Sequence, residues 1–220
     1  MLSAMYQPAH FRCEEFAHAR RFMAEQPLAL LIGPDAQGES FGSHLPLSLL
    51  ELPADGQGQP AWCLEGHMAR ANPHWAWLAG LLQAGGPQVL AVFSGPGAYV
   101  SPRHYDSLQN VPTWNYMAVH VYGELELVDE VQAKDALLKR LITSHEPAYA
   151  EQWRGLSPDY QQRLLGAIVG FRLHIRRWEA KFKLSQNRSA AERQRIRAAW
   201  SEGGDPREQE LAAWMEKLGL

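Results

Sequence analysis

The sequence has little cysteine and no long run of hydrophobic residues. Its two cysteines among 220 residues, Cys13 and Cys63, are too few for a disulfide framework and lack the CxxC spacing of a redox or zinc motif. The longest aliphatic run, residues 28–32, is far shorter than the ~20 residues that cross a bilayer. Residues 1–10 lack a cationic region followed by an apolar stretch. We therefore expect a soluble protein of the reducing cytoplasm, without a membrane partner.

An excess of positive charge is also absent. The chain has 21 Lys and Arg against 24 Asp and Glu, a formal net charge of −3, which argues against a protein that coats nucleic acid by bulk attraction. The charge is uneven, however, because residues 172–197 carry nine cations against two glutamates. An expected helix carries Arg193, Arg195 and Arg197. These three cations either form a solvated face or contact DNA phosphates. Any DNA partner is expected there.

Several motifs of catalysis and ligand binding are missing. The chain has no Gly-Lys-Ser/Thr of a P-loop and no Gly-x-Ser-x-Gly elbow, and Gly95-Pro96-Gly97-Ala98 lacks the third glycine of a dinucleotide fingerprint. Residues 95–97 are predicted to form a tight turn between two strands. His67 and His74 stand seven positions apart without a cysteine pair, which is no standard ligand spacing. We predict no metal site and assign no catalytic residue.

Residue patterns predict a mainly β fold with peripheral helices. Strand-like runs follow one another without regular crossover helices, which favours a mainly antiparallel barrel over a doubly wound sheet. The predicted strands are residues 28–33, 43–50, 61–69, 89–94, 98–101, 114–128 and 168–175. The predicted helices are residues 15–24, 72–83, 129–145, 157–165, 190–200 and 207–218. A loop is expected at residues 53–60, and Gly85-Gly86 should end the second helix.

The longest predicted strand, residues 114–128, has two occupied faces. Tyr116, Ala118 and His120 alternate with Met117 and Val119, so neither face is purely polar. Such a strand is typical of a barrel or of a dimer contact.

Residues 66–75 contain a first candidate anion site. His67 and Arg70 lie where a predicted strand ends, and Asn72-Pro73 starts a helix whose first amides could join them in holding a phosphate. The alternative is that Asn72 only caps the helix while Arg70 faces solvent. Both interpretations stay open from the sequence.

Residues 181–188 contain a second candidate. In an extended stretch Lys181 and Lys183 point to the same side. Gln186, Asn187 and Arg188 then add amide and guanidinium groups that can bind carbonyl or phosphate oxygens. We interpret this stretch as functional rather than as a solvated face.

Five blocks together resemble a known family. They are Met5-Tyr6-x-Pro8-x-His10-Phe11, the stretch from Gly66-His67-Met68-Ala69-Arg70 to Ala71-Asn72-Pro73-His74-Trp75, Phe93-x-Gly95-Pro96-x-Ala98-Tyr99-Val100-Ser101-Pro102, Val111-Pro112-Thr113-Trp114-Asn115-Tyr116, and Lys181-Phe182-Lys183-Leu184-Ser185-Gln186-Asn187-Arg188. In this order they resemble the PaiB-type FMN-binding negative transcriptional regulators. The resemblance implies a split β-barrel related to the pyridoxamine-phosphate-oxidase-like flavoproteins. It also implies a homodimer with FMN in clefts between the subunits.

The resemblance implies roles for particular residues. The implied FMN-binding residues are His67, Arg70 and Asn72 with Lys183 at the phosphate and ribityl chain, Trp114, Asn115 and Tyr116 at the ring or its rim, Ser94 and Ser101 as hydroxyl donors, and Gln186, Asn187 and Arg188 in the pocket or bracing it. Trp114 could instead be a packed core or interface residue. We expect residues 1–188 to form the FMN-binding domain and residues 189–220 a helical appendage packed on the barrel.

Three functions remain open from the sequence. The first is an FMN-binding homodimer that represses transcription and contacts DNA. The second is an FMN-dependent oxidoreductase, because the related barrels use the flavin to accept hydride. The third is a barrel that handles heme or pyridoxal phosphate, which an absorption spectrum would distinguish.

Overall fold

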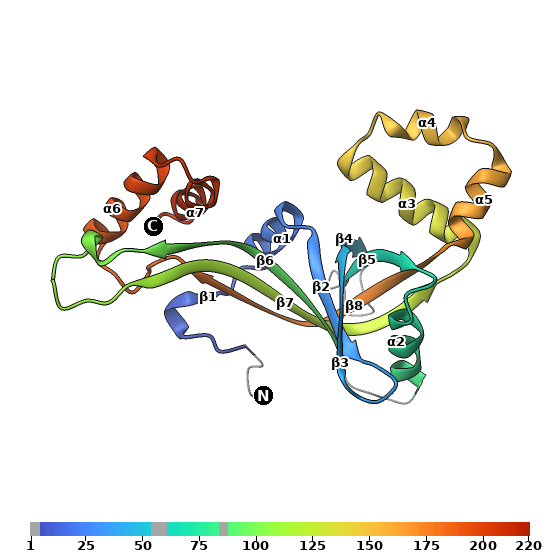
Figure 1. Ribbon diagram of the computed structural model, residues 1–220, viewed down its shortest axis with the longest axis horizontal. Helices are drawn as coiled ribbons and strands as arrows, with labels where there is room; N and C mark the ends of the chain where they lie inside the picture. The colour runs from blue at the N-terminus through green and yellow to red at the C-terminus, as the bar shows by residue number, and fades with distance from the viewer. Residues whose placement is uncertain (1–4, 54–60, 84–87) are drawn as a thin grey trace. The chain divides into compact units, whose positions relative to one another are not determined.

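The strands form one eight-stranded sheet, whose arrangement can be followed in Figure 1. This computed structural model describes residues 5–53, 61–83 and 88–220. The strands are β1 (Arg12–Cys13), β2 (Leu28–Pro34), β3 (Ser40–Pro46), β4 (Ser48–Leu52), β5 (Ala61–Ala69), β6 (Val89–Val100), β7 (Thr113–Val128) and β8 (Ile168–Lys183). Their order is β3-β2-β6-β7-β8-β5-β4, with β1 also pairing with β8, and the pairs β1–β8, β2–β3, β2–β6, β4–β5 and β5–β8 are antiparallel. The predicted mainly antiparallel β architecture is confirmed.

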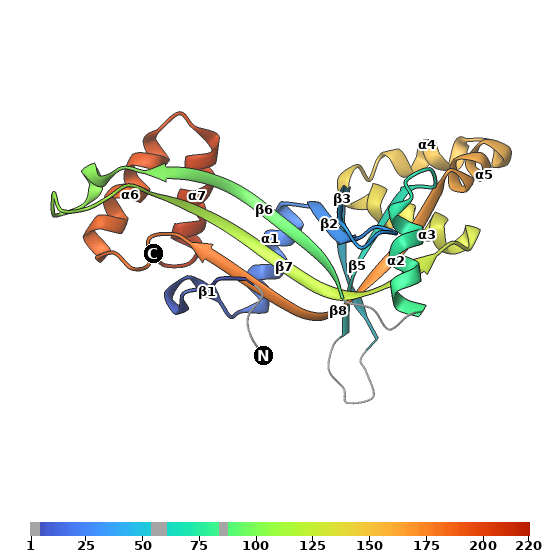
Figure 2. The ribbon, with the colours of Figure 1, turned by 60° about the horizontal axis from the view of Figure 1, so that its bottom comes forward.

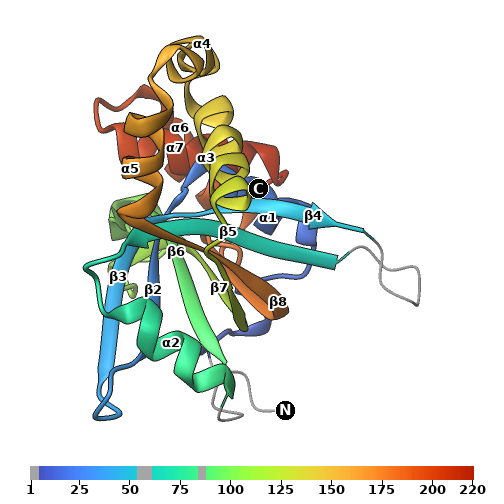
Figure 3. The same cartoon turned by 90° about the vertical axis from the view of Figure 1, so that its right-hand side faces the viewer.

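Helices occupy the segments between and after the strands. They are α1 (Phe16–Glu25), α2 (His74–Gln83), α3 (Val131–His145), α4 (Tyr149–Gly155), α5 (Pro158–Gly166), α6 (Ala190–Glu202) and α7 (Pro206–Lys217), with short 3-10 helices η1 (Ala9–Phe11) and η2 (Pro102–His104). Figure 2 shows α6 and α7 side by side, and Figure 3 shows α2 running beside β2. Within the described ranges, no helix is both long and apolar enough to span a membrane.

Most predicted elements agree with the structure to within a few residues. The six predicted helices correspond to α1, α2, α3, α5, α6 and α7, whereas α4 was not predicted. A capping box begins α6, where the side chain of Ser189 accepts a hydrogen bond from the amide of Glu192 and the Glu192 carboxylate accepts one from the amide of Ser189. Residues 54–60 of the expected loop and the helix end at Gly85-Gly86 lie outside the described residues.

The single strand predicted over residues 43–50 is wrong, because the chain forms two strands there. β3 ends at Pro46, which pairs with Leu28, and the following Leu47 donates its amide to the carbonyl of Pro27 at 2.8 Å. Leu47 is buried, and after it β4 pairs with β5 instead of β2. The alternation of residue types continues through Leu47, so the sequence gives no sign that the chain changes its pairing partner.

The turn predicted at residues 95–97 is also wrong, because β6 runs unbroken from Val89 to Val100. A Cβ on Gly95 would lie 2.6 Å from Cε2 of Phe22, so this glycine permits a close approach of the ring. Pro96 lies beyond Val92, the last residue in the β2–β6 register, where a missing amide costs no bond to β2. Burial alternates on odd positions up to Phe93 and on even positions from Ala98, as it does across a β-bulge.

The chain divides into two compact units. Unit 1 contains Met1–Phe22, Phe93–His120 and Glu179–Leu220, and unit 2 contains Met23–Val92 and Val121–Trp178. β6, β7 and β8 each contribute residues to both units. The helices α6 and α7 share unit 1 with the N-terminal segment, while the division into residues 1–188 and 189–220 stays a prediction.

Each unit has its own core. In unit 1 the rings of Phe22, Phe182 and Trp214 meet with centroids 5.5–6.1 Å apart, and all three side chains are buried. In unit 2 a Cβ on Gly33 would lie 2.3 Å from Cδ2 of Leu78, so this glycine lets α2 pack closely on β2. Both contacts join residues far apart in the sequence.

Candidate functional site

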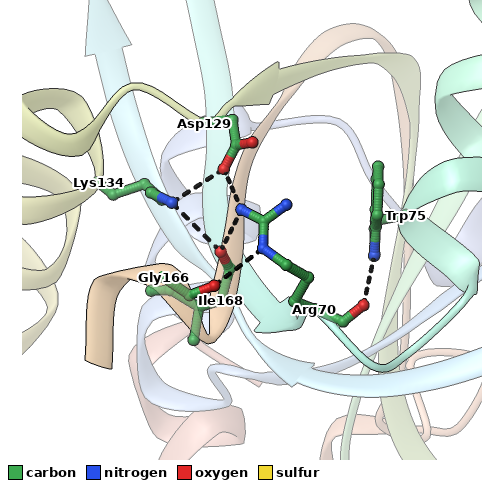
Figure 4. A network of polar contacts seen from close by, with 6 residues as sticks. All are labelled: Arg70, Trp75, Asp129, Lys134, Gly166 and Ile168. Carbon is green, nitrogen blue, oxygen red and sulfur yellow. Dashed lines mark hydrogen bonds and ion pairs between the residues drawn. The ribbon is translucent and has the colours of Figure 1, made fainter. Parts of the chain in front are cut away.

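In unit 2, Arg70 follows the last residue of β5 and makes its polar contacts with the chain itself (Figure 4). Its Nε donates to the carbonyl of Gly166 at 2.9 Å, and its Nη2 contacts Asp129 Oδ1 at 2.5 Å and the carbonyl of Ile168 at 3.1 Å. The guanidinium therefore fastens the end of β5 to the start of β8. It is 39% exposed, so one edge of it still faces solvent.

Asp129 is shared by two cations. Besides Arg70, the ammonium of Lys134 lies 2.9 Å from Oδ1, and Lys134 is buried. The hydrogen bond from Arg70, and after it that from Lys134, lowers the pKa of the Asp129 carboxyl. Two cations against one carboxylate leave this cluster a formal charge of +1.

Asn72 caps α2, as one of the two interpretations of the sequence predicts, whereas the other part of that interpretation is wrong, because Arg70 pairs with Asp129 instead of only facing solvent. Its Oδ1 accepts the amide of His74 at 3.0 Å, and its Nδ2 donates to Ser43 Oγ at 3.1 Å. Ser43 Oγ also lies 2.9 Å from Nδ1 of His74. The side chain of Asn72 is thus committed to joining β3 to the start of α2.

His67 lies on β5 opposite Gly170 of β8 and is half-buried. Its Nδ1 is buried and has no hydrogen-bond partner in the described part of the chain. Burial lowers the pKa of His67, so the ring is neutral near pH 7. An unpaired buried ring nitrogen is a costly feature that a hydroxyl or amide of a ligand would satisfy.

In unit 1, two aromatic side chains stand exposed near the start of β7. Trp114 is 55% exposed and Tyr99 of β6 is 48% exposed, with ring centroids 6.3 Å apart in an edge-to-face arrangement. Leu108 and Val111 of the intervening loop are exposed as well. A group of exposed apolar side chains in one region of a protein usually marks a surface that binds a ligand or another protein. Trp114 is therefore not a core residue of its unit.

Lys183 reaches the same part of β7. Its ammonium contacts Thr113 Oγ1 and donates to the carbonyl of Trp114 at 2.6 Å. Burial, and then the charge of Lys181, lowers the pKa of Lys183. Lys181 lies 5.3 Å from the ring centroid of Tyr116 and is buried. The structure therefore brings together the lysine pair, Trp114 and Tyr116.

Asn115 is fully buried and its amide is paired with Ser185. Its Nδ2 donates to Ser185 Oγ at 2.9 Å, and Ser185 Oγ lies 3.2 Å from Oδ1. Gln186 binds its own chain, since its Oε1 accepts the amide of Leu184 at 2.7 Å. Both residues stabilise the end of β8, and their roles toward a ligand stay predictions.

The remaining predicted residues are spread over unit 1. Arg188 donates to Asn110 Oδ1 at 2.7 Å, and its guanidinium carbon lies 3.7 Å from the ring centroid of Tyr105. Ser101 Oγ accepts the amide of Arg103 at 3.3 Å and so begins η2. Ser94 and Asn187 are exposed. Their roles toward a ligand stay predictions.

Sequence reasoning left three neighbours of these residues out of the candidate site. Tyr6 is not among the predicted site residues, and its carbonyl and ring both contact Lys181. Tyr99 gave no signal beyond its aromatic character. Ser185 adopts a positive φ of 64°, which no residue pattern predicts for a serine.

The fold is a split β-barrel. Two solved structures show it: the flavocytochrome Anf3 from Azotobacter vinelandii and the FAD and heme binding protein from Mycobacterium smegmatis. The first matches with a TM-score of 0.58 at 17% identity over 78% of this chain and 69% of that one. The second matches with a TM-score of 0.58 at 15% identity over 79% and 73%. At such identities the likeness concerns the fold alone.

Sequence comparison then identifies the family. The family model described as "Putative FMN-binding domain" matches residues 5–177, and the chain belongs to this family. The chain is also 30% identical over 217 residues to the "Protease synthase and sporulation protein PAI 2" of Bacillus subtilis (strain 168), covering 96% of this chain and 97% of that protein. The resemblance to the PaiB type is confirmed, and the cofactor that the family assigns is FMN.

The residues present fit such a cofactor in their chemistry. Unit 1 offers exposed aromatic faces at Trp114 and Tyr99 and two ammonium groups at Lys181 and Lys183. Aromatic faces suit a planar ring, and ammonium groups suit a phosphate.

In the described residues, no group of three His, Cys, Asp or Glu side chains could hold a metal ion.

Proposed function

We propose that this chain binds FMN without a covalent bond, acts as a homodimer and negatively regulates transcription. Membership of the FMN-binding family carries the proposal. The PaiB resemblance supports the regulatory part, and the relative from Bacillus subtilis bears a name that refers to protease synthesis and sporulation. When bound, FMN supplies a yellow chromophore and a redox-active ring.

The surface of unit 1 supports the binding and dimer parts of the proposal. Tyr99, Leu108, Val111 and Trp114 expose apolar area that folding of the unit leaves uncovered. A flavin ring and a second protomer are both suited to such area. The test of assembly is sedimentation velocity with and without added FMN, in which a single monomeric species in both samples would contradict the dimer.

The three arginines of the basic helix α6 are hydrogen-bonded within the chain. Arg193 donates to the carbonyl of Arg188 at 2.6 Å, and Arg195 donates to the carbonyl of His104 at 2.8 Å. Arg197 donates to the carbonyl of Leu220 at 3.0 Å. Each guanidinium thus has a partner within the chain. If the protein binds DNA, we propose that the contact uses other cations or requires these arginines to exchange partners.

That observation favours a second candidate function, an FMN-dependent oxidoreductase. The three arginines of α6 are engaged within the chain, whereas a bound flavin accepts hydride wherever a donor can reach it. No acid, base or nucleophile is assigned, because orientation of the flavin suffices for hydride acceptance.

One preparation tests these proposals. The visible spectrum of freshly purified protein, with mass spectrometry of the released ligand, decides whether FMN is bound. Anisotropy with labelled duplex DNA at increasing salt then tests the regulator, and anaerobic addition of NADH or NADPH tests the oxidoreductase. Salt-sensitive DNA binding with an inert flavin supports regulation. Rapid bleaching by a nicotinamide without DNA binding supports the enzyme instead.

A further inference from the structure

Lys181 is a buried ammonium with no acidic partner. Only 8% of the residue is exposed, and its Nζ donates to the carbonyl of Tyr6 at 3.1 Å. The ring centroids of Tyr6 and Tyr116 each lie 5.3 Å from Nζ. Glu179, two residues earlier on β8, accepts the amide of Met5 at 2.9 Å. Within the described residues, no carboxylate forms an ion pair with Lys181.

Lys183, two residues after Lys181 on β8, is also an ammonium group that contacts oxygen acceptors and lies near an aromatic ring. Its ammonium contacts Thr113 Oγ1 and the carbonyl of Trp114, and the ring centroid of Phe11 lies 5.8 Å away. In the part of the chain that the structure describes, no carboxylate pairs with it either. Residues two apart on a strand point to the same face about 6.6 Å apart. Two like charges on one face without a counter-ion destabilise each other unless an anion joins them.

The remaining hydrogen-bond donors match a phosphate. An ammonium has three N–H donors. Lys181 uses one on Tyr6 and Lys183 uses two on Thr113 and Trp114, so three donors are left for a ligand among the described contacts. A phosphate monoester presents three terminal oxygens and a charge of about −1.5 to −2 near neutral pH. The negative charge of a phosphate therefore offsets the charge of the two ammonium groups, and its oxygens can accept their three remaining N–H donors.

Arg70 is the weaker phosphate site. Its cluster in unit 2 already contains the carboxylate of Asp129, which leaves a formal charge of +1 there. Its guanidinium also donates to the carbonyls of Gly166 and Ile168 (Figure 4). The two lysines carry a formal charge of +2, and among the described residues no carboxylate forms an ion pair with either of them, although Glu179 lies two residues before Lys181 on β8 and accepts the amide of Met5. The electrostatic demand for a dianion is thus greater at the lysine pair.

We propose that Lys181 and Lys183 together hold the phosphate group of the flavin, and that Arg70 is a structural residue. This inference rests on the proposed function, since it names the subsite within the FMN-binding protein. Tyr6 belongs to the subsite as well, because its carbonyl orients the ammonium of Lys181 and its ring covers it. The assignment adds Lys181 to the binding residues and removes Arg70.

Comparing FMN with riboflavin isolates the phosphate. The full-length protein, stripped of flavin, is titrated with each compound and its flavin fluorescence is followed. Lys181→Met and Lys183→Met keep most of the side-chain length and remove the charge, and Lys183→Arg restores it. Lys139→Met is the matched control, because Lys139 is exposed and pairs with Asp135. Arg70→Met tests the rival site, and circular dichroism confirms that each variant folds.

The inference predicts a selective loss. Either lysine-to-methionine variant should weaken FMN binding about tenfold or more and change riboflavin binding less than twofold, since a charge-assisted contact is lost only with FMN. Lys183→Arg should recover much of the loss, whereas Arg70→Met and Lys139→Met should keep the preference for FMN. An undiminished preference in both lysine variants, or its loss in Arg70→Met, would overturn the assignment.

A failure of the proposed function gives a different result. If wild-type protein binds neither flavin, FMN binding is refuted, and inorganic phosphate then serves as the probe. Phosphate at constant ionic strength should raise the melting temperature of wild type and of Lys139→Met but not of Lys181→Met or Lys183→Met. No difference among these four proteins would overturn the anion site as well.

Discussion

Asn115 holds Ser185 in a left-handed backbone conformation by a pair of side-chain hydrogen bonds. Ser185 has φ of 64°, and its hydroxyl lies 2.9 Å from Nδ2 and 3.2 Å from Oδ1 of Asn115. Both side chains are buried, so neither can exchange its partner for water. The turn that follows β8 directly after Lys183 therefore depends on this pair.

Replacement of Ser185 should separate the hydrogen bond from the backbone strain. Ser185→Ala leaves the Asn115 amide unpaired and should lower the free energy of unfolding by about 1–3 kcal/mol. Ser185→Gly loses the same hydroxyl but accepts a positive φ readily, so it should be about 1 kcal/mol more stable than Ser185→Ala. Urea denaturation measures both. An alanine variant as stable as the glycine variant would contradict this account.

A side chain at Gly95 should destabilise the fold. In Gly95→Ala the new Cβ would lie 2.6 Å from the ring of the buried Phe22, so we expect a loss of about 1–3 kcal/mol in the free energy of unfolding. Gly80→Ala is the matched control, because nothing lies within 4 Å of its Cβ position and it sits in α2. That control should gain about 0.5–1 kcal/mol from helix propensity. Equal effects in thermal denaturation would refute the role of close packing.

Glu65 should be a major anchor of α3. Its buried carboxylate accepts Arg140 Nε at 2.8 Å and Nη2 at 2.7 Å, and Arg172 Nε at 3.0 Å. Glu65→Ala should lower the free energy of unfolding by about 3 kcal/mol, near the low end for a broken buried pair because both arginines still reach water.

Asp135→Ala is the comparison for Glu65, since that carboxylate bonds the exposed Lys139 and Trp153 Nε1. It should cost about 1 kcal/mol. Hydrogen exchange in α3 should rise more in the Glu65 variant. A smaller effect at Glu65 than at Asp135 would show that the buried triad does not anchor the helix.

Acid should destabilise the protein through its buried histidines. Burial lowers the pKa of His74 below its ordinary 6.5, and the same cause acts at His67. At acidic pH the unfolded chain therefore binds protons at these histidines more readily than the folded chain does. Their contribution to the free energy of unfolding is fully present above pH 6.5 and is lost as the pH falls below that value. Asp129, whose pKa is lowered from 3.8, contributes only at more acidic pH.

The histidine contribution is measured as the slope of unfolding free energy against pH. His74→Gln keeps a side chain that can bond Ser43 and removes the titrating ring, so its slope between about pH 7 and pH 5 should be shallower than that of wild type. An unchanged slope would mean that His74 is protonated equally in the folded and unfolded states.

The sequence by itself determined the local elements, the family and the cofactor. The turn-rich loop expected before it placed β5 at residues 61–69 as the structure has it, and Asn72-Pro73 marked the start of α2. These signals are local, because periodicity and capping depend on residues close in the chain. The even spacing of Lys181 and Lys183 was likewise sufficient to put both on one face.

Only the tertiary structure decided which charges are already balanced. Arg70 meets Asp129 across 59 positions of sequence, and Asn115 meets Ser185 across 70, so no local pattern reports either pair. The same holds for Gly95, whose need for a bare backbone comes from the ring of Phe22 and not from a turn. A cation's availability to a ligand depends on its partners in space, and those partners are set by sheet pairing rather than by neighbours in the chain.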